Sequence, residues 1–235
     1  MGAVTETLPE AKARRVAEEL RRIGAAHSPA VLASSLGAED MVLTDLISRE
    51  APGIAVFSLD TGRLNAETYE LMQQVKTRYP DLDYRIYAPE AADVEALVQG
   101  YGPNAFYESL DLRKQCCHVR KVKPLQRALA GNSAWITGMR RLQSVTRKDL
   151  EPETWDEANG LYKFNPLYDW SQAEVWGYIR AHGVPYNALH EQGYASVGCA
   201  PCTRPIAAGE DERAGRWWWE DPEAKECGLH LNRES

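Results

Sequence analysis

The stretch Ala30-Val31-Leu32-Ala33-Ser34-Ser35-Leu36-Gly37-Ala38-Glu39-Asp40 indicates how this chain folds. It begins with a short apolar run fit for a buried strand, and an apolar helix is expected from about Met41. The loop between them, Ser34 to Asp40, contains Gly37, which lets the backbone come close to an anion, and the helix N-terminus offers N–H groups. Capping alone produces similar loops, so the stretch indicates an α/β unit more strongly than it indicates a ligand.

Strands and helices alternate along most of the chain. Apolar runs and helical periodicity predict further strands at Ile54–Leu59, Tyr84–Tyr87 and Ala134–Thr137, and helices at Pro9–Ala26, Ala66–Tyr79, Ala92–Gln99, Gln115–Leu129 and Ala173–Ala181. Pro124 is expected to kink or break the helix that contains it. Ser171 and Glu174 form a capping-box pattern before the last helix, which Gly183 should end. This order predicts an α/β fold with a doubly wound, mostly parallel, Rossmann-like sheet.

Three loops should meet at the carboxyl ends of these strands, where such sheets bind ligands. They are Ser34 to Asp40, Asp60-Thr61-Gly62 and Gly138 to Arg147, all rich in hydroxyls, glycine or arginine. The Rossmann glycine fingerprint and the P-loop motif are both absent from the sequence, which disfavours nicotinamide chemistry and ordinary ATP hydrolysis.

Composition narrows the function classes. The 235 residues carry a net charge of −7, which argues against a general nucleic-acid binder, and no apolar stretch approaches the length of a membrane span. Arg113 to Lys148 nevertheless contains ten Lys or Arg and no Asp or Glu. This basic segment favours a compact anion as ligand, with a solvated basic face as the alternative.

The cysteines carry further information. Cys116 and Cys117 are adjacent, and Cys199 and Cys202 form a Cys-x-x-Cys pair. Four thiolates suit a tetrahedral zinc or an iron–sulfur cluster, and the vicinal pair favours the larger centre. Disulfides and unligated core thiols are the alternatives, but no apolar N-terminal run directs the chain to an oxidising compartment, so we expect a cytoplasmic protein with reduced thiols.

The fifth cysteine is left over. Cys227 lies near the C-terminus and is followed by Gly228 and then His230. A spare thiol beside a base is a candidate nucleophile.

Taken together, the motifs resemble the assimilatory adenylyl-sulfate reductases, within the phosphoadenylyl-sulfate/adenylyl-sulfate reductase family. The resemblance extends from about Val31 to His230 and rests on Ser35-Leu36-Gly37-Ala38-Glu39-Asp40, Leu59-Asp60-Thr61-Gly62, Cys116-Cys117-His118-Val119-Arg120-Lys121, Gly138-Met139-Arg140-Arg141, Gly198-Cys199-Ala200-Pro201-Cys202 and Glu226-Cys227-Gly228-Leu229-His230. It implies an adenine nucleotide alpha-hydrolase-like fold. Some members have Ser-Gly where this chain has Leu36-Gly37, which removes one side-chain donor from the loop.

The resemblance also implies a mechanism. Cys227 would attack the sulfur of adenylyl sulfate, AMP would leave, and thioredoxin or glutaredoxin would release sulfite from the Cys–S–sulfonate. His230 and Lys121 would assist in the catalytic site. The two cysteine pairs would bind a [4Fe–4S] cluster that tunes the site without passing electrons to the substrate.

Substrate contacts are implied by position. The nucleotide would be bound by Ser34, Ser35, Gly37, Asp40, Asp60, Thr61, Gly62 and Gly138, and the phosphosulfate by Arg140, Arg141 and Arg147, with Arg213 and Arg216 close to Cys227 in sequence. Residues 1–206 would form the reductase domain, and residues 207–235 would form a mobile tail that carries the nucleophile.

Other functions remain open at this point. A phosphoadenylyl-sulfate reductase performs the same chemistry but typically lacks the four cluster cysteines. An ATP-pyrophosphatase relative shares the fold but uses a different Ser-Gly-rich loop. A zinc-stabilised, non-catalytic nucleotide-binding module would leave Cys227 without a role. The sequence is also compatible with a homo-oligomer.

Overall fold

The fold is built on one six-stranded sheet. The structure, a computed structural model, describes residues 8–144 and 147–221. The strands are β1 (Ala30–Ala33), β2 (Ala55–Leu59), β3 (Tyr84–Tyr87), β4 (Ala134–Ile136), β5 (Glu153–Asp156) and β6 (Leu161–Phe164). Their order is β3-β2-β1-β4-β6-β5, and all neighbours are parallel except β5 and β6. This arrangement confirms the predicted doubly wound, mostly parallel sheet.

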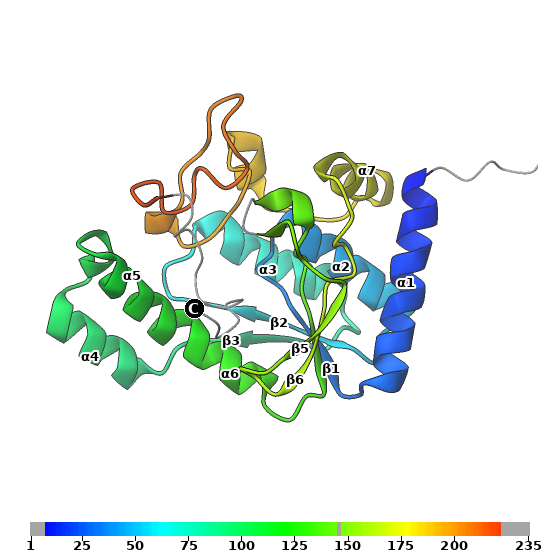
Figure 1. Cartoon of the computed structure of the whole chain (residues 1–235), viewed down its shortest axis with the longest axis horizontal. Coiled ribbons are helices and arrows are strands. Elements are labelled where there is room, and N and C mark those ends of the chain that lie inside the picture. Colours follow the sequence, from blue (N-terminus) through cyan, green and yellow to red (C-terminus); the bar gives the residue numbers. More distant parts are fainter. Residues whose placement is uncertain (1–7, 145–146, 222–235) are drawn as a thin grey trace, which may run out of the picture.

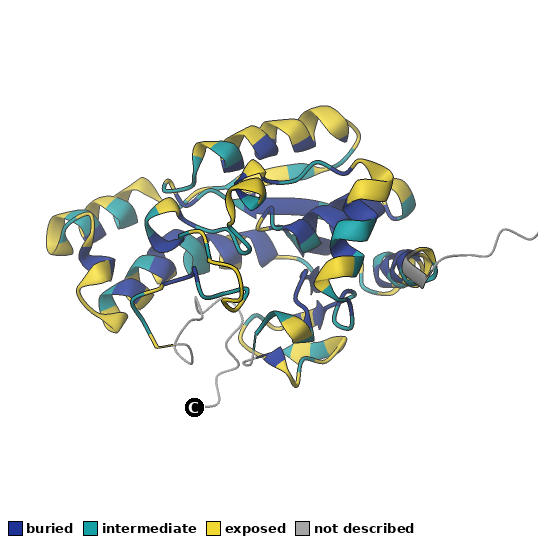
Figure 2. Ribbon diagram, turned by 90° about the horizontal axis from the view of Figure 1, so that it is seen from above, coloured by how far each residue is buried: buried dark blue, intermediate teal, exposed yellow. Residues whose placement is uncertain are grey.

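Helices cover both faces of the sheet (Figure 1). The helices in the described ranges include α1 (Leu8–Ala26), α2 (Ala38–Glu50), α3 (Ala66–Arg78), α4 (Ala91–Tyr101), α5 (Leu110–Cys117), α6 (Lys123–Leu129) and α7 (Gln172–His182), with short 3-10 helices at Ala105–Tyr107, Arg141–Gln143, Ala188–Gln192 and Ala200–Cys202. One core cluster joins α1, α2, α3 and α7 to one face, and a smaller one joins α6 to the other. Successive residues of a strand therefore enter different cores, as Val56 and Phe57 do. Figure 2 shows the strands as the buried layer between these helices.

Most predicted elements agree with the structure to within a few residues. The capping box at Ser171 and Glu174 is present, and Gly183 ends α7 in the left-handed conformation. The hairpin of β5 and β6 was not predicted. Its turn contains Asn159-Gly160, a dipeptide typical of tight turns, and that signal could have indicated it.

Pro124 does not break its helix, so that part of the prediction was wrong. Helical structure continues from Leu110 to Leu129, because a π-helical turn at His118–Val122 joins α5 to α6. Pro124 then occupies the first turn of α6, where a missing backbone N–H costs little. The π turn follows directly after the vicinal cysteines, and such turns are frequent at functional sites.

The described part of the predicted tail, residues 207–221, contacts the body of the protein. The backbone N–H of Trp217 donates to the carbonyl of Cys202 (3.1 Å), and that of Arg204 donates to Gly215 (3.0 Å). Glu220 forms a bidentate ion pair with Arg113. The domain boundary at residue 206 and a movement of the tail stay predictions. No helix within the described ranges is long and apolar enough to cross a membrane.

The sheet has its switch point between β1 and β4, where the order of the strands reverses. Asp40, in the first turn of α2, connects the two sides of this point. It accepts hydrogen bonds from the backbone N–H of Ser35 (2.6 Å) and from that of Gly138 (3.0 Å). A side chain at Gly138 would place its Cβ 2.3 Å from Asp40 Oδ1 and 2.9 Å from the Cβ of Glu39. This close approach requires glycine.

We therefore expect Gly138→Ala to destabilise the protein by about 1–3 kcal/mol, because the two loops must separate to admit the methyl group. Gly177→Ala is the matched control. Gly177 lies inside α7 with open space around it, so the same substitution should stabilise the fold by about 0.5–1 kcal/mol. Urea unfolding of both variants checks this pair. Equal effects in the two variants would contradict the close packing at Gly138.

Candidate active site

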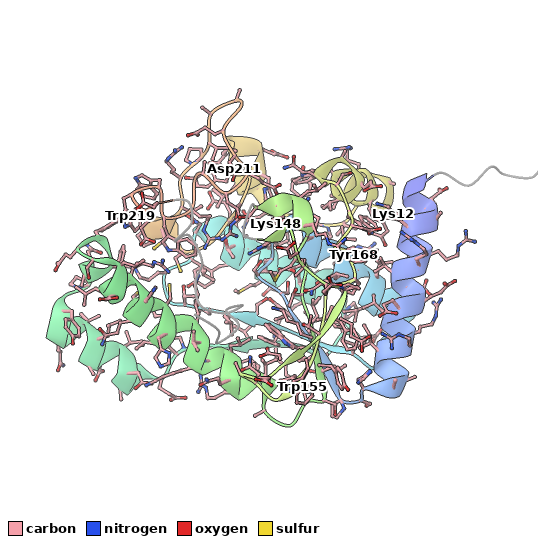
Figure 3. All side chains as sticks on the ribbon, viewed as in Figure 1. Lys12, Lys148, Trp155, Tyr168, Asp211 and Trp219 are labelled. Atoms are coloured by element: carbon pink, nitrogen blue, oxygen red, sulfur yellow. The ribbon has the colours of Figure 1, made fainter. Side chains whose placement is uncertain are left out.

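A cavity of about 200 Å³ lies at the carboxyl ends of β1, β2 and β4. Its walls come from the predicted loops Ser34–Asp40 and Gly138–Arg147, from Thr61, and from two later segments, residues 195–199 and 212–217. Figure 3 labels Asp211 on the loop that lies above the sheet in this view. The structure thus brings together segments that are far apart in the sequence, at the place where such sheets bind ligands.

One part of the cavity is apolar. Phe57, Leu59, Leu125 and Trp135 line it, and they belong to the core cluster on the α6 face of the sheet. This part can receive a flat aromatic group such as a purine base. The hydroxyls of Ser34 and Ser35 and the backbone around Gly37 supply polar groups beside it.

The cavity is also lined by four cationic side chains, those of Lys121, Arg147, Arg213 and Arg216. Lys121 comes from the π turn, and the last two come from residues 207–221, the described part of the predicted tail. A cavity that combines an apolar part with several cations suits an anionic nucleotide.

Arg140 and Arg141 lie elsewhere. Arg140 is fully buried, and its guanidinium donates to Glu39 (2.7 Å) and to Glu212 (2.9 Å), which neutralises its charge within the fold. Burial raises the pKa of Glu212, although the charge of Arg140 opposes that shift. Arg141 donates to the carbonyl of Leu150 (2.7 Å) and stacks on Tyr168. Neither arginine lines the cavity.

The predicted turn at Asp60-Thr61-Gly62 contributes Thr61 to the cavity but not its neighbours. Asp60 accepts from the N–H of Gly62 (2.8 Å), so its carboxylate shapes the turn. Arg120 donates to the carbonyl of Thr61 (2.7 Å), and the Thr61 hydroxyl lies 3.2 Å from the Cys199 sulfur. The turn therefore connects the larger cavity to the cysteines.

A second, smaller cavity is lined by all four predicted ligand cysteines, Cys116, Cys117, Cys199 and Cys202. All four are free thiols, and three of them are buried. Lys121 and Trp217 line both cavities, and Arg63, Arg113 and Arg120 line the smaller one. The end of α5 thus supplies Cys116 and Cys117, and the 3-10 helix at Ala200–Cys202, together with its N-cap Cys199, supplies the other pair.

Charge around these thiols favours thiolates at one position in particular. Burial raises the pKa of Cys202 to about 12 and also raises that of Cys116. Burial opposes ionisation of Cys199 as well, but Lys121, the Thr61 hydroxyl and Arg216 outweigh it and lower the pKa of Cys199. A cationic shell of this kind is what a group of thiolate ligands requires.

The four cysteines are also candidate ligands of a metal centre. In the part of the chain that the structure describes, no group of three or more His, Cys, Asp or Glu side chains is arranged to hold one metal ion. A structural zinc needs four convergent ligands, each about 2.0–2.3 Å from the metal. Four cysteines around one cavity match in number the ligands of a four-cysteine iron–sulfur cluster, the centre expected from the sequence.

Sequence reasoning missed His190, which also lines the larger cavity. Its Nδ1 lies 2.7 Å from the carbonyl of Tyr194, so this nitrogen carries the proton, and its Nε2 has no hydrogen-bond partner among the described residues. Burial lowers the pKa of His190, which favours the neutral ring. In the sequence, His190 follows a short loop and lies far from the recognised motifs, so no pattern there indicated a role for it. Cys227 and His230, the predicted catalytic pair, lie outside the described residues.

The fold and the cavity define a doubly wound α/β protein with a ligand site at its switch point, beside a four-cysteine site. Comparison with known proteins gives the family. The sequence profile of the phosphoadenosine phosphosulfate reductase domain matches residues 29–205. The adenosine 5'-phosphosulfate reductase of Allochromatium vinosum is 56% identical over 226 residues, which are 96% of this chain and 88% of the relative. The enzyme of the same name from Neisseria meningitidis is 50% identical over 96% of this chain and 93% of its own length. The chain therefore belongs to the phosphoadenosine phosphosulfate reductase family, which confirms the resemblance.

Solved structures agree with this assignment. The phosphoadenylyl-sulfate reductase from Candida auris, in complex with phosphate, superposes with a TM-score of 0.70 at 26% identity and covers 87% of this chain and 100% of its own. The FMN adenylyltransferase of Candida glabrata superposes with a TM-score of 0.57 at 15% identity, covering 96% of this chain and 78% of its own. The second likeness shows the fold alone.

The Asp40 carboxylate gives a pH-dependent prediction. Burial raises its pKa from 3.8 to about 6, although hydrogen bonds from Ser35 and Gly138 oppose the shift. A raised pKa favours the protonated form in the folded state, so the stabilising contribution is complete below about pH 4 and is lost as the pH rises through 6. The advantage of the wild-type protein over Asp40→Asn in unfolding free energy should fall by up to about 3 kcal/mol between pH 4 and pH 7. Anaerobic urea unfolding across that range is the measurement, and a constant difference would contradict the assignment.

Proposed function

We propose that this protein reduces adenylyl sulfate to sulfite and AMP with electrons from a dithiol protein of the thioredoxin or glutaredoxin class. The observation that carries the proposal is the contiguity of two sites. A cavity with an apolar part and four cations adjoins a cavity lined by four cysteines, and Lys121 lines both. The relatives named above are adenosine 5'-phosphosulfate reductases, which supports the same substrate here.

The nucleotide would occupy the larger cavity. Its purine would enter the apolar part, and its ribose and phosphate would lie along the loop that begins at Ser34. Arg147, Arg213 and Arg216 would meet the negative oxygens of the phosphosulfate. We therefore assign the anion to these three arginines rather than to Arg140 and Arg141, whose guanidinium groups are engaged elsewhere.

The reaction would proceed in two displacements. The Cys227 thiolate attacks the sulfur of adenylyl sulfate and forms an S–S bond, while the S–O bond to the phosphate breaks and its electron pair leaves with AMP. A thiolate of the reductant then attacks Sγ of Cys227, and sulfite leaves with the electron pair of the S–S bond. The second thiol of the reductant closes its own disulfide and returns Cys227 to the thiol form, so two electrons reach the sulfur.

Cations are needed because every participant is anionic. A thiolate must approach a sulfuryl group whose oxygens carry negative charge, and the leaving AMP gains a further charge. Lys121, Arg213 and Arg216 would lower both barriers by stabilising charge where it develops. We propose that His230 assists as a proton donor for the Cys227 step.

The free thiols among the described cysteines agree with a protein of the reducing cytoplasm.

The four cysteines that line the smaller cavity would hold a [4Fe–4S] cluster. When bound, it would supply a fixed charge beside the sulfate site, and it would not serve as the electron donor. Anaerobically purified protein should therefore be brown and contain about four irons with matching sulfide. Cys117→Ser should lose iron and sulfide together, whereas Cys227→Ser should keep both. One bound zinc without acid-labile sulfide would contradict this proposal.

The function itself is tested with two nucleotides side by side. Adenylyl sulfate without reductant should leave a sulfonate on Cys227, detected by mass spectrometry of the intact protein and its peptides, and added thioredoxin should release one sulfite per chain. Cys227→Ser should bind nucleotide yet release none. Preferred turnover of phosphoadenylyl sulfate would instead make the protein a phosphoadenylyl-sulfate reductase. An adduct on another cysteine would show that the nucleophile is misassigned.

A further inference from the structure

Trp217 occupies an unusual position between the two cavities. Its side chain is 1% exposed, and it lines both. Its backbone has a φ of +41°, a conformation that a bulky residue rarely adopts and that costs on the order of 1–3 kcal/mol. Such strain persists only where the surroundings impose it, so the position of this ring is set by its neighbours.

Two guanidinium groups stack on this one indole. The Cζ of Arg113 lies 4.7 Å from the centre of the Trp217 ring, and the Cζ of Arg216 lies at the same distance, 4.7 Å. A cation over an indole face is attracted by the ring quadrupole, and the attraction grows when both groups are shielded from water. Arg113 and Arg216 are 0% and 7% exposed, so both contacts are shielded.

Arg113 provides the fixed side of the stack. Its guanidinium donates to both carboxylate oxygens of Glu220, at 2.9 and 2.7 Å. It also interacts with the thiol of Cys117, which lines the smaller cavity. The backbone N–H of Trp217 donates to the carbonyl of Cys202 (3.1 Å), which anchors the residue to the other cysteine pair.

Arg216 provides the side that faces the larger cavity. Its Nη1 donates to the carbonyl of Val197 (3.0 Å), and its Nε has no hydrogen-bond partner in the described part of the chain. The guanidinium lies against Gly198, where an added Cβ would come within 2.4 Å of Nη2. One backbone carbonyl, a glycine and the Trp217 ring therefore define where this charge sits.

We infer that Trp217 is a positioning residue, which holds the Arg216 guanidinium in the substrate cavity through the Arg113–Trp217–Arg216 stack. The inference rests on the proposed function, because it assigns Arg216 to the anionic part of the nucleotide. The stack also links that guanidinium to the cysteine site, since Trp217 and Arg113 are both anchored there. Loss of the ring would leave Arg216 with its single bond to Val197 and let the charge leave the cavity.

Binding of two probes tests this role. ADP carries a second anionic group where adenylyl sulfate carries its sulfate, whereas adenosine carries no charge. Trp217→Leu should weaken ADP about 3- to 30-fold, the range expected from loss of a cation–π contact, and should change adenosine less than twofold. Trp217→Phe keeps an aromatic face and should recover most of the ADP affinity. Trp218→Leu is the control, since Trp218 is 40% exposed and contacts other aromatic rings (Figure 3 labels its neighbour Trp219).

A double-mutant cycle separates positioning from general packing. If Trp217 acts through Arg216, Trp217→Leu should have little further effect on ADP in an Arg216→Ala background. Additive losses, or equal losses of ADP and adenosine in Trp217→Leu, would overturn the inference. If the wild-type protein bound neither probe, that result would contradict the proposed function itself. The outcomes named above contradict only the role of Trp217, so the two failures are distinguishable.

Gly198→Ala keeps the test informative if Trp217→Leu does not fold. The three atoms nearest to the added methyl group all belong to the end of the flexible Arg216 side chain, with Nη2 at 2.4 Å and Cζ at 2.5 Å, so the fold can accommodate it by moving the guanidinium. The variant leaves Trp217 and Arg113 in place. It should lose ADP affinity by a similar factor while retaining adenosine, and unchanged ADP binding would overturn the inference.

Discussion

The carboxylate of Asp40 is the interaction on which the site depends. Two parallel strands that diverge at a switch point leave their following loops free to separate, and a ligand cavity needs those loops at a fixed distance. Asp40 accepts backbone N–H groups from both loops, at Ser35 and at Gly138, and it is buried while doing so. That burial raises the pKa of the carboxyl to about 6, and its two bonds hold together the loops that line the larger cavity.

Charge is the second constraint, and the protein divides its arginines between two tasks. Arg113 and Arg140 are fully buried, and each is neutralised by carboxylates from residues 207–221, namely Glu220 and Glu212. These pairs attach that segment to the body of the protein. Arg213 and Arg216, which lie between the two glutamates in sequence, line the cavity. Buried ion pairs thus fix the backbone on both sides of the residues that would meet an anionic ligand.

Sequence reasoning predicted the sheet, most helices, the switch-point loops and the grouping of four cysteines, because apolar periodicity, glycine positions and thiol spacing report these directly. It could not separate Arg140 and Arg141 from Arg213 and Arg216. Arg140 and Arg141 lie in a motif within the basic segment, whereas Arg213 and Arg216 follow acidic residues. Only tertiary structure shows that Glu39 and Glu212 engage Arg140, and that the Leu150 carbonyl and Tyr168 engage Arg141. The β5–β6 hairpin was missed because its strands are short and its outer strand is half exposed. His190 belongs to no motif, so only the cavity reveals it.

The π turn at His118–Val122 has a consequence for how this protein can vary. A π turn contains one residue more than the α-helical turn it replaces, and each residue of an α-helix rotates the chain by about 100°. The extra residue is absorbed within this one turn, so the cysteine pair at the end of α5 and the face of α6 that packs on the sheet keep the relative facing of a regular helix. Removal of one residue would leave Cys116 and Cys117 directed much as before, but it would shift the side chains of the turn itself. Lys121 is one of these and lines both cavities, so it would be the residue most affected by a change of length here.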